Sequence, residues 1–137
     1  MLDKNAILVI GVDLVKDGRI LANAYDDAGC VTARFNLNIL KRINRELGAN
    51  FNLKAFKHRA FFNEVESRVE MHLVSMYAQE VCVRGRVFRF FAGETIHTEN
   101  SYKYTMESFQ RLAGESGWST LGFWTDNLFG VHAFAIH

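Results

Sequence analysis

An unbroken apolar run near the start of the chain, Ala6–Val12, constrains the fold more than any other feature. It has the length of a strand and lacks alternation, a pattern typical of a strand buried on both faces. Such strands belong to parallel sheets covered by helices. Asp13 follows at the end that faces the ligand crevice in open parallel sheets, where it either serves a ligand or merely ends the strand. Because a central strand needs neighbours on both sides, we expect this chain to be a piece of a larger protein.

Size and charge exclude several classes of protein. The 137 residues are 49% hydrophobic, which is enough for one domain with a core. The net charge is only +1, which argues against a protein whose main role is to grip nucleic acid or an anionic membrane. No apolar run approaches the roughly 18–20 residues of a membrane-spanning helix, and we expect no secretory signal.

Cysteine and histidine spacing gives two further expectations. Cys30 and Cys82 are far apart and form no CxxC pair, so we expect a reducing, cytoplasmic environment. The histidines show neither HxxxH spacing nor a pairing with cysteine, so we expect no metal site.

Periodicity divides the chain into nested blocks. Helical spacing predicts helices over Asp17–Tyr25, over Thr32–Leu47 and from Thr105 to Gly117. Period-two alternation from Phe56 to Phe91 predicts an antiparallel meander of about four strands. Two aromatic-rich strands with a short link predict a closing hairpin, Trp118–Thr125 with Phe129–Ile136. The two ends therefore resemble one sheet protein, and the middle resembles an insertion into it.

The segment that concentrates polar chemistry is ETIHTENSYKY, Glu94–Tyr104, which has no clear periodicity. Polar residues on a loop held by rigid elements indicate either a functional role or a solvated connection. In an extended segment Glu99 and Ser101 point the same way and offer a carboxylate and a hydroxyl to an imidazole or an amine. No histidine is clearly placed to activate Ser101, so we do not expect Ser101 to act as a nucleophile.

Four segments of the chain resemble the C-terminal part of the histidine Nα-methyltransferase family. These S-adenosylmethionine-dependent enzymes trimethylate histidine to hercynine on the way to ergothioneine. The segments follow the family's order and spacing, and together they are specific. They are GVDLVKD (Gly11–Asp17), AYDDAGCVTARFNLNIL (Ala24–Leu40), RVEMHLVS (Arg68–Ser75) and ETIHTENSYKY.

The resemblance implies a Rossmann-like methyltransferase domain with a substrate-binding domain inserted late in its sheet. Residues 1–14 would be a late strand of that sheet. Residues 15–103 would be the insert, a helix plus an antiparallel sheet, and residues 104–137 the last helix and the closing hairpin. The implied class is α/β for the enzyme and α+β for this portion.

The resemblance also implies the roles of four residues. Tyr25 matches the tyrosine that holds the substrate carboxylate, and Met71 matches a residue that lines the substrate cavity. Glu99 and Ser101 match the pair that reads the substrate imidazole. Tyr25 and Met71 are equally compatible with core positions. The implied reaction is methyl transfer from a sulfonium to the α-nitrogen, with positioning as the main catalytic device and no catalytic residue in this chain.

The chain departs from the family in what it lacks. No GxGxxG motif follows a strand, so no cofactor fingerprint is visible. The family's glycine-rich loop, its acidic ribose contact and the asparagine that grips the amino acid have no counterpart here. We therefore expect a missing N-terminal half to bind most of the S-adenosylmethionine, and this chain alone to be inactive.

Two other interpretations of function stay open. A relative could act on another amino acid or amine, because Glu99 also suits an ammonium group. The chain could instead be a non-catalytic binding or assembly domain. In each case an uncovered strand Ala6–Val12 predicts a homo-oligomer or association with the missing half.

Overall fold

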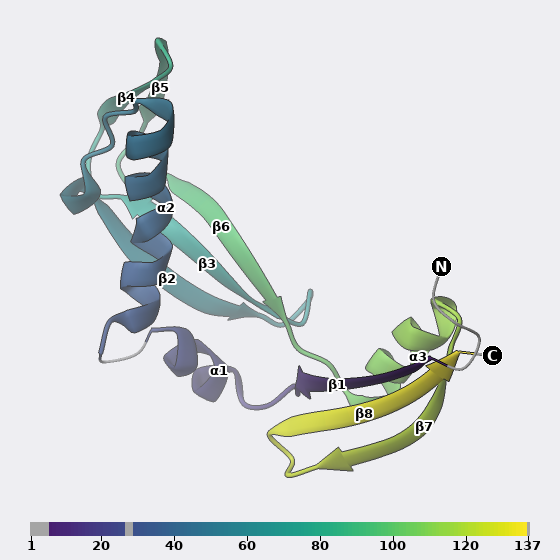
Figure 1. The fold of residues 1–137 in the computed structure, drawn as a ribbon. Coiled ribbons are helices and arrows are strands. Elements are labelled where there is room, and N and C mark those ends of the chain that lie inside the picture. Colours follow the sequence, from purple (N-terminus) through teal and green to yellow (C-terminus); the bar gives the residue numbers. More distant parts are fainter. Residues whose placement is uncertain (1–5, 27–28, 137) are drawn as a thin grey trace. The chain divides into compact units, whose positions relative to one another are not determined.

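The computed structural model describes residues 6–26 and 29–136, so Asp27 and Ala28 of the AYDDAG segment lie outside it. Its helices are α1 (Gly18–Tyr25), α2 (Val31–Leu47) and α3 (Met106–Glu115), with a 3-10 turn η1 at Leu53–Ala55. Its strands are β1 (Ile7–Asp13), β2 (Phe56–Asn63), β3 (Arg68–Ser75), β4 (Gln79–Val83), β5 (Arg86–Phe90), β6 (Thr95–Tyr102), β7 (Trp118–Thr125) and β8 (Phe129–Ile136) (Figure 1). The expected mixture of helices and antiparallel sheets is confirmed. Within the described ranges, no helix has the length and apolar character that crossing a membrane requires.

The described chain forms two compact units. The first contains residues 6–17, 65–67 and 102–136, and so carries β1, α3, β7 and β8. The second contains residues 18–26, 29–64 and 68–101, and so carries α1, α2, β2 to β5 and most of β6. The assignment of residues 1–14, 15–103 and 104–137 to a methyltransferase sheet and its insert stays a prediction.

In the first unit, β1 forms the edge of the described sheet, whose order is β1-β8-β7. It runs antiparallel to β8, with Ile7 opposite Ala135. Ile7 and Val9 are 66% and 65% exposed. Within the described residues, β1 therefore has an uncovered edge and exposed apolar side chains, as expected of a strand separated from its other neighbours, and the parallel neighbours themselves stay a prediction. An apolar run indicates that both faces suit an apolar environment, but it does not encode the direction of the neighbouring strand, which the β7–β8 hairpin sets.

Two local predictions near the C-terminus are confirmed. The Thr105 hydroxyl accepts a hydrogen bond from the Ser108 backbone N–H at 3.1 Å, and the Ser108 hydroxyl accepts one from the Thr105 N–H at 2.9 Å. This capping box starts α3. β7 and β8 pair antiparallel. Their turn is held by the Asp126 carboxylate, which accepts two backbone N–H groups at 2.8 Å.

The second unit corrects the predicted meander. β2 and β3 form a hairpin, but the other neighbour of β3 is β6, and β4 pairs with β5 in a separate two-stranded sheet. The segment expected to lack regular structure is therefore largely strand β6. Gly93, at a φ of 82°, makes the turn that starts this pairing: its N–H donates to the Ser75 carbonyl. Alternation predicted the strands but carries no information about which of them become neighbours.

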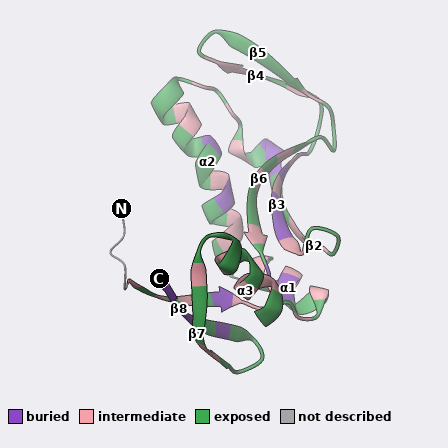
Figure 2. Cartoon of the chain, turned by 90° about the vertical axis from the view of Figure 1, so that its right-hand side faces the viewer, coloured by how far each residue is buried: buried purple, intermediate pink, exposed green. Residues whose placement is uncertain are grey.

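Helix α2 packs against β2 and β3 to form the core of the second unit. The fully buried centre contains Leu40 of α2, Phe56 of β2 and Leu73 of β3, none more than 3% exposed. Phe51 and Phe90 pack against Phe56 and against each other, with ring centroids 5.6–6.3 Å apart. Figure 2 shows buried residues concentrated along β3. This core supports the two strands that carry the candidate site.

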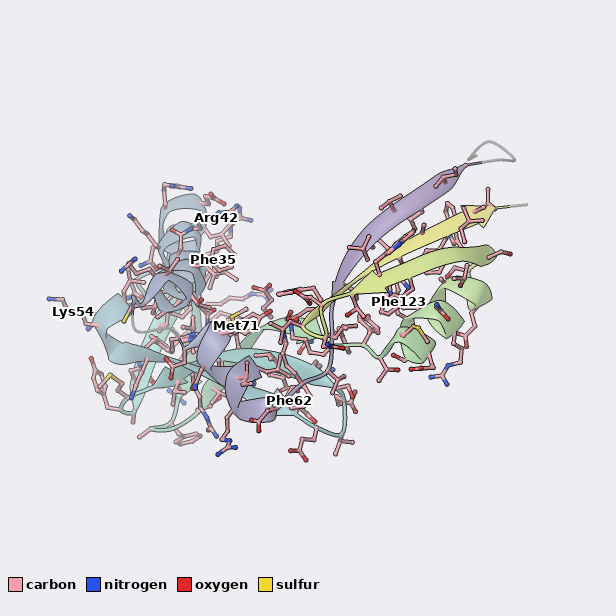
Figure 3. The ribbon with its side chains drawn as sticks, turned by 90° about the horizontal axis from the view of Figure 1, so that it is seen from below. Phe35, Arg42, Lys54, Phe62, Met71 and Phe123 are labelled. Carbon is pink, nitrogen blue, oxygen red and sulfur yellow. The ribbon has the colours of Figure 1, made fainter. Side chains whose placement is uncertain are left out.

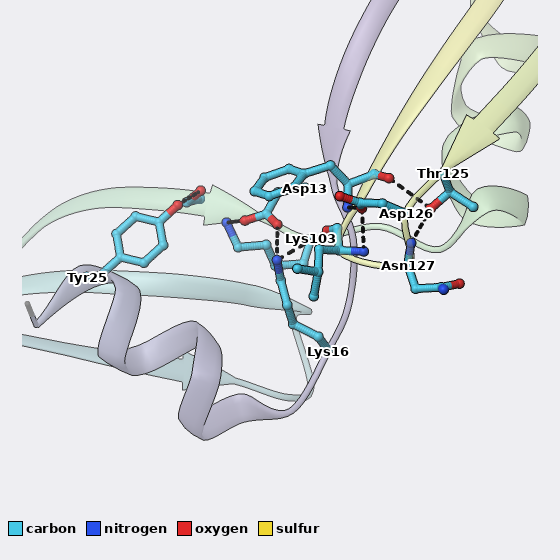
Figure 4. A network of polar contacts seen from close by, with 10 residues as sticks. Asp13, Lys16, Tyr25, Lys103, Thr125, Asp126 and Asn127 are labelled. Atoms are coloured by element: carbon cyan, nitrogen blue, oxygen red, sulfur yellow. Dashed lines mark hydrogen bonds and ion pairs between the residues drawn. The ribbon is translucent and has the colours of Figure 1, made fainter.

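Asp13 ends β1 in an ion-pair network of the first unit (Figure 4). Its carboxylate oxygens lie 2.8 Å from Lys16 Nζ and 2.9 Å from Lys103 Nζ, and the Lys103 side chain is 0% exposed. Burial raises the pKa of the Asp13 carboxyl, but hydrogen bonds from Lys16 and Lys103 outweigh it and hold that pKa below its usual range. The Tyr104 N–H also donates to the Asp13 carbonyl at 3.2 Å. The network therefore ties β1 to the segment that follows β6.

The ion pair between Asp13 and Lys103 can be removed by substituting either residue, and we expect the two substitutions to lower the free energy of unfolding by different amounts. We expect Asp13→Asn to lower the free energy of unfolding by about 3 kcal/mol or more, because the buried Lys103 ammonium loses its ion pair with Asp13. Lys103→Met removes the buried charge and leaves Asp13 paired with Lys16, so its loss should be less than half as large. Urea unfolding of the two variants measures both values, and equal losses would contradict the assignment of the ion pair.

His132 of β8 is buried in an aromatic pocket of the first unit. It is 0% exposed, and its ring centroid lies 4.5–5.4 Å from those of Phe123, Phe109 and Phe134. Among the described residues, neither ring nitrogen has a hydrogen-bond partner. Burial lowers the pKa of the His132 imidazole, because its charged form would lose hydration without gaining a partner.

The unfolded chain therefore takes up a proton at this histidine more readily than the folded chain does. Stability from this group is complete above the ordinary histidine pKa of about 6.5 and is lost as the pH falls through it. We expect His132→Phe to remove this part of the pH dependence, so that the variant gains most, relative to wild type, at pH 5. Thermal unfolding from pH 5 to pH 8 checks this, and parallel curves for the two proteins would refute it.

Candidate functional site

Two of the four residues predicted to bind substrate are in direct contact in the second unit. The Tyr25 hydroxyl, at the end of α1, lies 2.7 Å from the Ser101 hydroxyl on β6. The two residues are 76 positions apart in the sequence. α1 packs against β2 and β3, which gives its last turn access to the face that Ser101 occupies.

β6 contains one residue more than the stretch of β3 opposite it. The Ser75 N–H donates to the Glu94 carbonyl at one end, and the Lys103 N–H donates to the Ser67 carbonyl at the other. β3 advances eight positions between these points and β6 advances nine, so β6 contains a β-bulge. The alternation of exposed and half-buried residues along β6 breaks at Glu99 and Asn100, which are both exposed.

The bulge explains how Glu99 reaches its position. Bulges re-aim side chains and are frequent beside active sites. Glu99 lines a cavity of about 190 Å³ between β6 and α2. The cavity wall combines an aromatic ring, amides and a guanidinium, and its other lining residues are Phe35, Asn36, Asn38, Ile39, Arg42 and Thr98. Figure 3 labels Phe35 and Arg42 on α2. The expected carboxylate is therefore placed beside a small cavity whose wall contains both apolar and polar side chains.

Met71, the fourth predicted residue, has a core position. It lies in β3 opposite Ala60 of β2 and is 2% exposed. Its backbone carbonyl accepts a hydrogen bond from the Thr98 hydroxyl at 2.8 Å, one residue before Glu99. Met71 therefore supports the strand that carries the candidate site, and a role in lining a substrate cavity stays a prediction.

A buried histidine connects α2 to the end of α1. His58 is 6% exposed, its Nδ1 lies 2.9 Å from Asn36 Nδ2, and its Nε2 lies 2.8 Å from the Tyr25 carbonyl oxygen. Asn36 Nδ2 also donates to the His72 carbonyl at 3.3 Å, so the amide NH₂ group must face both acceptors. His58 Nδ1 therefore accepts a hydrogen bond from Asn36. His58 Nε2 carries the hydrogen and donates a hydrogen bond to the Tyr25 carbonyl oxygen.

This network positions Tyr25, and sequence reasoning did not identify it. Asn36 and His58 are polar residues on faces that are otherwise apolar, the Asn36 face of α2 and the inward face of β2. A buried polar side chain needs a partner. The sequence did offer one indication of this network: a polar residue at a position where the periodicity of the helix or strand predicts burial. Such a residue does not indicate which partner it bonds.

The tautomer of His58 is directly measurable. We expect long-range ¹H–¹⁵N spectra to show His58 Nε2 protonated and Nδ1 unprotonated at neutral pH. Asn36→Leu should destabilise the chain by about 1–3 kcal/mol, because the His58 Nδ1 acceptor is left buried without its donor. Asn38→Leu, an amide on the same helix beside the cavity, is the matched control and should have a smaller effect. A protonated Nδ1 in the wild type would contradict the network.

The comparisons with known proteins match this chain to histidine methyltransferases. A family profile described as a histidine-specific, SAM-dependent methyltransferase matches residues 1–136. A histidine N-alpha-methyltransferase of Mycolicibacterium smegmatis is 46% identical over 121 residues, and one of Mycobacterium tuberculosis is 43% identical over the same length. Each alignment covers 87% of this chain and 38% of the relative.

A more distant relative extends the match along the chain. Ergothioneine biosynthesis protein 1 of Neurospora crassa is 28% identical over 138 aligned residues, which cover 98% of this chain and 15% of the relative. The chain therefore spans well under half the length of each of these relatives.

Proposed function

This chain belongs to the family of histidine-specific, S-adenosylmethionine-dependent methyltransferases, and we propose that it is the substrate-recognising C-terminal portion of an enzyme that methylates the α-amino group of L-histidine. The observation that carries the proposal is the contact between Tyr25 and Ser101 at 2.7 Å, with Glu99 two residues earlier on the same strand. Three of the four residues expected from the resemblance thus lie on one short part of the second unit.

The side chains suit the polar groups of histidine. A carboxylate accepts hydrogen bonds from an imidazole N–H, and a hydroxyl both donates and accepts, so Glu99 and Ser101 together can satisfy both ring nitrogens. The Tyr25 hydroxyl can donate to a carboxylate while it accepts from Ser101. These residues bind the substrate and orient it. Their catalytic contribution is to place the α-nitrogen of the substrate for in-line attack on the methyl group.

We propose that the described residues supply little of the cofactor site. The acidic side chain at the end of β1, Asp13, is already paired with two lysines. The described glycines with positive φ, Gly48, Gly85, Gly93 and Gly117, lie in separate turns and form no single loop. We therefore place most of the S-adenosylmethionine contacts, and the source of the methyl group, in the part of the complete enzyme that precedes this chain, and expect the chain alone to be inactive.

Other substrates and other roles remain distinct alternatives. Glu99 would also pair with an ammonium group, and Phe35 in the same cavity wall suits an organic cation, which favours a related amine as the second candidate. The exposed side chains of Ile7 and Val9 support association of β1 with the rest of the enzyme or with a second copy.

The complete enzyme with substitutions at Glu99 tests the substrate. A hydrogen bond to a charged group contributes about 1.5–3 kcal/mol, so Glu99→Ala should weaken histidine binding about ten- to a hundredfold. Glu80→Ala, an exposed glutamate of the same unit, is the matched control and should leave the affinity unchanged. Calorimetric titration with histidine measures both.

The outcomes separate the alternatives. Unchanged histidine affinity in Glu99→Ala would overturn the assignment of Glu99 to the imidazole. Methylation of an amine in preference to histidine by the wild-type enzyme would favour the second candidate. A complete enzyme that methylates no amino acid or amine would favour a binding or assembly domain.

A further inference from the structure

A second polar cluster lies on the other face of the β2-β3-β6 sheet. Side chains alternate between faces along a strand, and the pairs His58–Leu73 and Ala60–Met71 point toward the helices. The intervening residues of β3, Glu70 and His72, therefore point away from them. β6 contributes His97, whose ring stacks on that of His72 at a centroid distance of 4.4 Å.

We propose that Glu70, His72 and His97 form a binding site for a divalent transition-metal ion of the Zn²⁺ type. One ligand atom from each residue lies within 4.8 Å of the others. Two imidazoles and one carboxylate are a donor set that suits Zn²⁺ and the neighbouring first-row metals, whereas Mg²⁺ and Ca²⁺ prefer oxygen ligands. Three protein ligands leave at least one coordination position open to water.

The contact between Glu70 and His72 already has the dimensions of such a site. His72 Nε2 lies 3.0 Å from Glu70 Oε2. An ion bound to both atoms by bonds of about 2.0–2.2 Å would have a nitrogen–metal–oxygen angle near 90°. It can therefore take the place of the hydrogen between His72 and Glu70 with little movement of either side chain. His97 must bring a ring nitrogen closer. Its exposed side chain can do so by rotation, at the expense of its 2.7 Å hydrogen bond to Asn100 and of its stacking on His72.

The surroundings prepare the carboxylate for this role. Glu70 Oε1 accepts hydrogen bonds from Arg68 and Asn63 at 2.9 Å, which fixes the group and leaves Oε2 toward the histidines. Outer contacts of this kind orient metal ligands.

His72 also has a ring nitrogen that makes no hydrogen bond within the described part of the chain. Among the described residues, His72 Nδ1 is buried without a hydrogen-bond partner. Phe61 stacks on the same ring at 5.3 Å and limits its rotation. An ion held between β3 and β6 would cross-link the two strands beside the bulge, two residues along β6 from Glu99. The proposal does not depend on the substrate proposed for that residue.

Titration of the tag-free chain with ZnCl₂, followed by calorimetry, tests the site. We expect one ion per chain, with a Kd at or below the micromolar range, and a rise in the thermal unfolding midpoint with added Zn²⁺. Co²⁺ in place of Zn²⁺ should give visible absorption bands of a nitrogen- and oxygen-ligated ion. No saturable binding at millimolar Zn²⁺ would overturn the proposal.

Variants assign the ligands. His97→Ala removes an exposed side chain, so it should leave the fold intact and weaken Zn²⁺ binding at least tenfold. The double variant Cys30→Ser/Cys82→Ser removes the alternative thiol ligands and should bind as the wild type does. Binding that survives His97→Ala, or that is lost in the cysteine variant, would show that the cluster is only a stacked pair that holds β3 to β6.

Discussion

The pairing of β6 with β3 is the interaction on which the functional surfaces of this chain depend. It joins residues on either side of the β4–β5 hairpin, from the Ser75–Glu94 bond to the Ser67–Lys103 bond. Its free energy comes from backbone hydrogen bonds and from the core beneath β3, because β6 itself has no fully buried side chain. Without this pairing, Ser101 would not meet Tyr25, and His97 would not meet His72.

The chain segments that precede and follow the second unit are joined to each other. Within the first unit, Leu14 forms a parallel bridge with Tyr104, and Asp13 pairs with the buried Lys103. A buried ion pair of this kind adds little net stability over apolar packing, because desolvation offsets the attraction. Its contribution is specificity, since another register would break the ion pair between Lys103 and Asp13. The sequence left two roles open for Asp13, and these contacts support the structural one.

Local features were predictable from the sequence, and pairings were not. The capping box at Thr105 and the turn at Asp126 rest on residues within three positions of each other, so short patterns identify them. The direction of the strand beside β1 and the neighbour of β3 depend on segments far away in the chain. Glu99 and Ser101 were predicted from the resemblance and from period two, and their roles stay predictions. His58 was missed because one polar residue in a buried phase does not reveal its partner Asn36.

One extra residue in β6 allows this strand to contact His72 on one face of the sheet and Tyr25 on the other. In a regular strand His97, Glu99 and Ser101 would all point to one face, because they are two residues apart. In this strand His97 stacks on His72 on the face away from the helices, whereas Ser101 bonds Tyr25 of α1. The bulge between them supplies the change of face. A regular strand would have to give up one of these contacts, so the bulge is required by both surfaces rather than being a defect of the pairing.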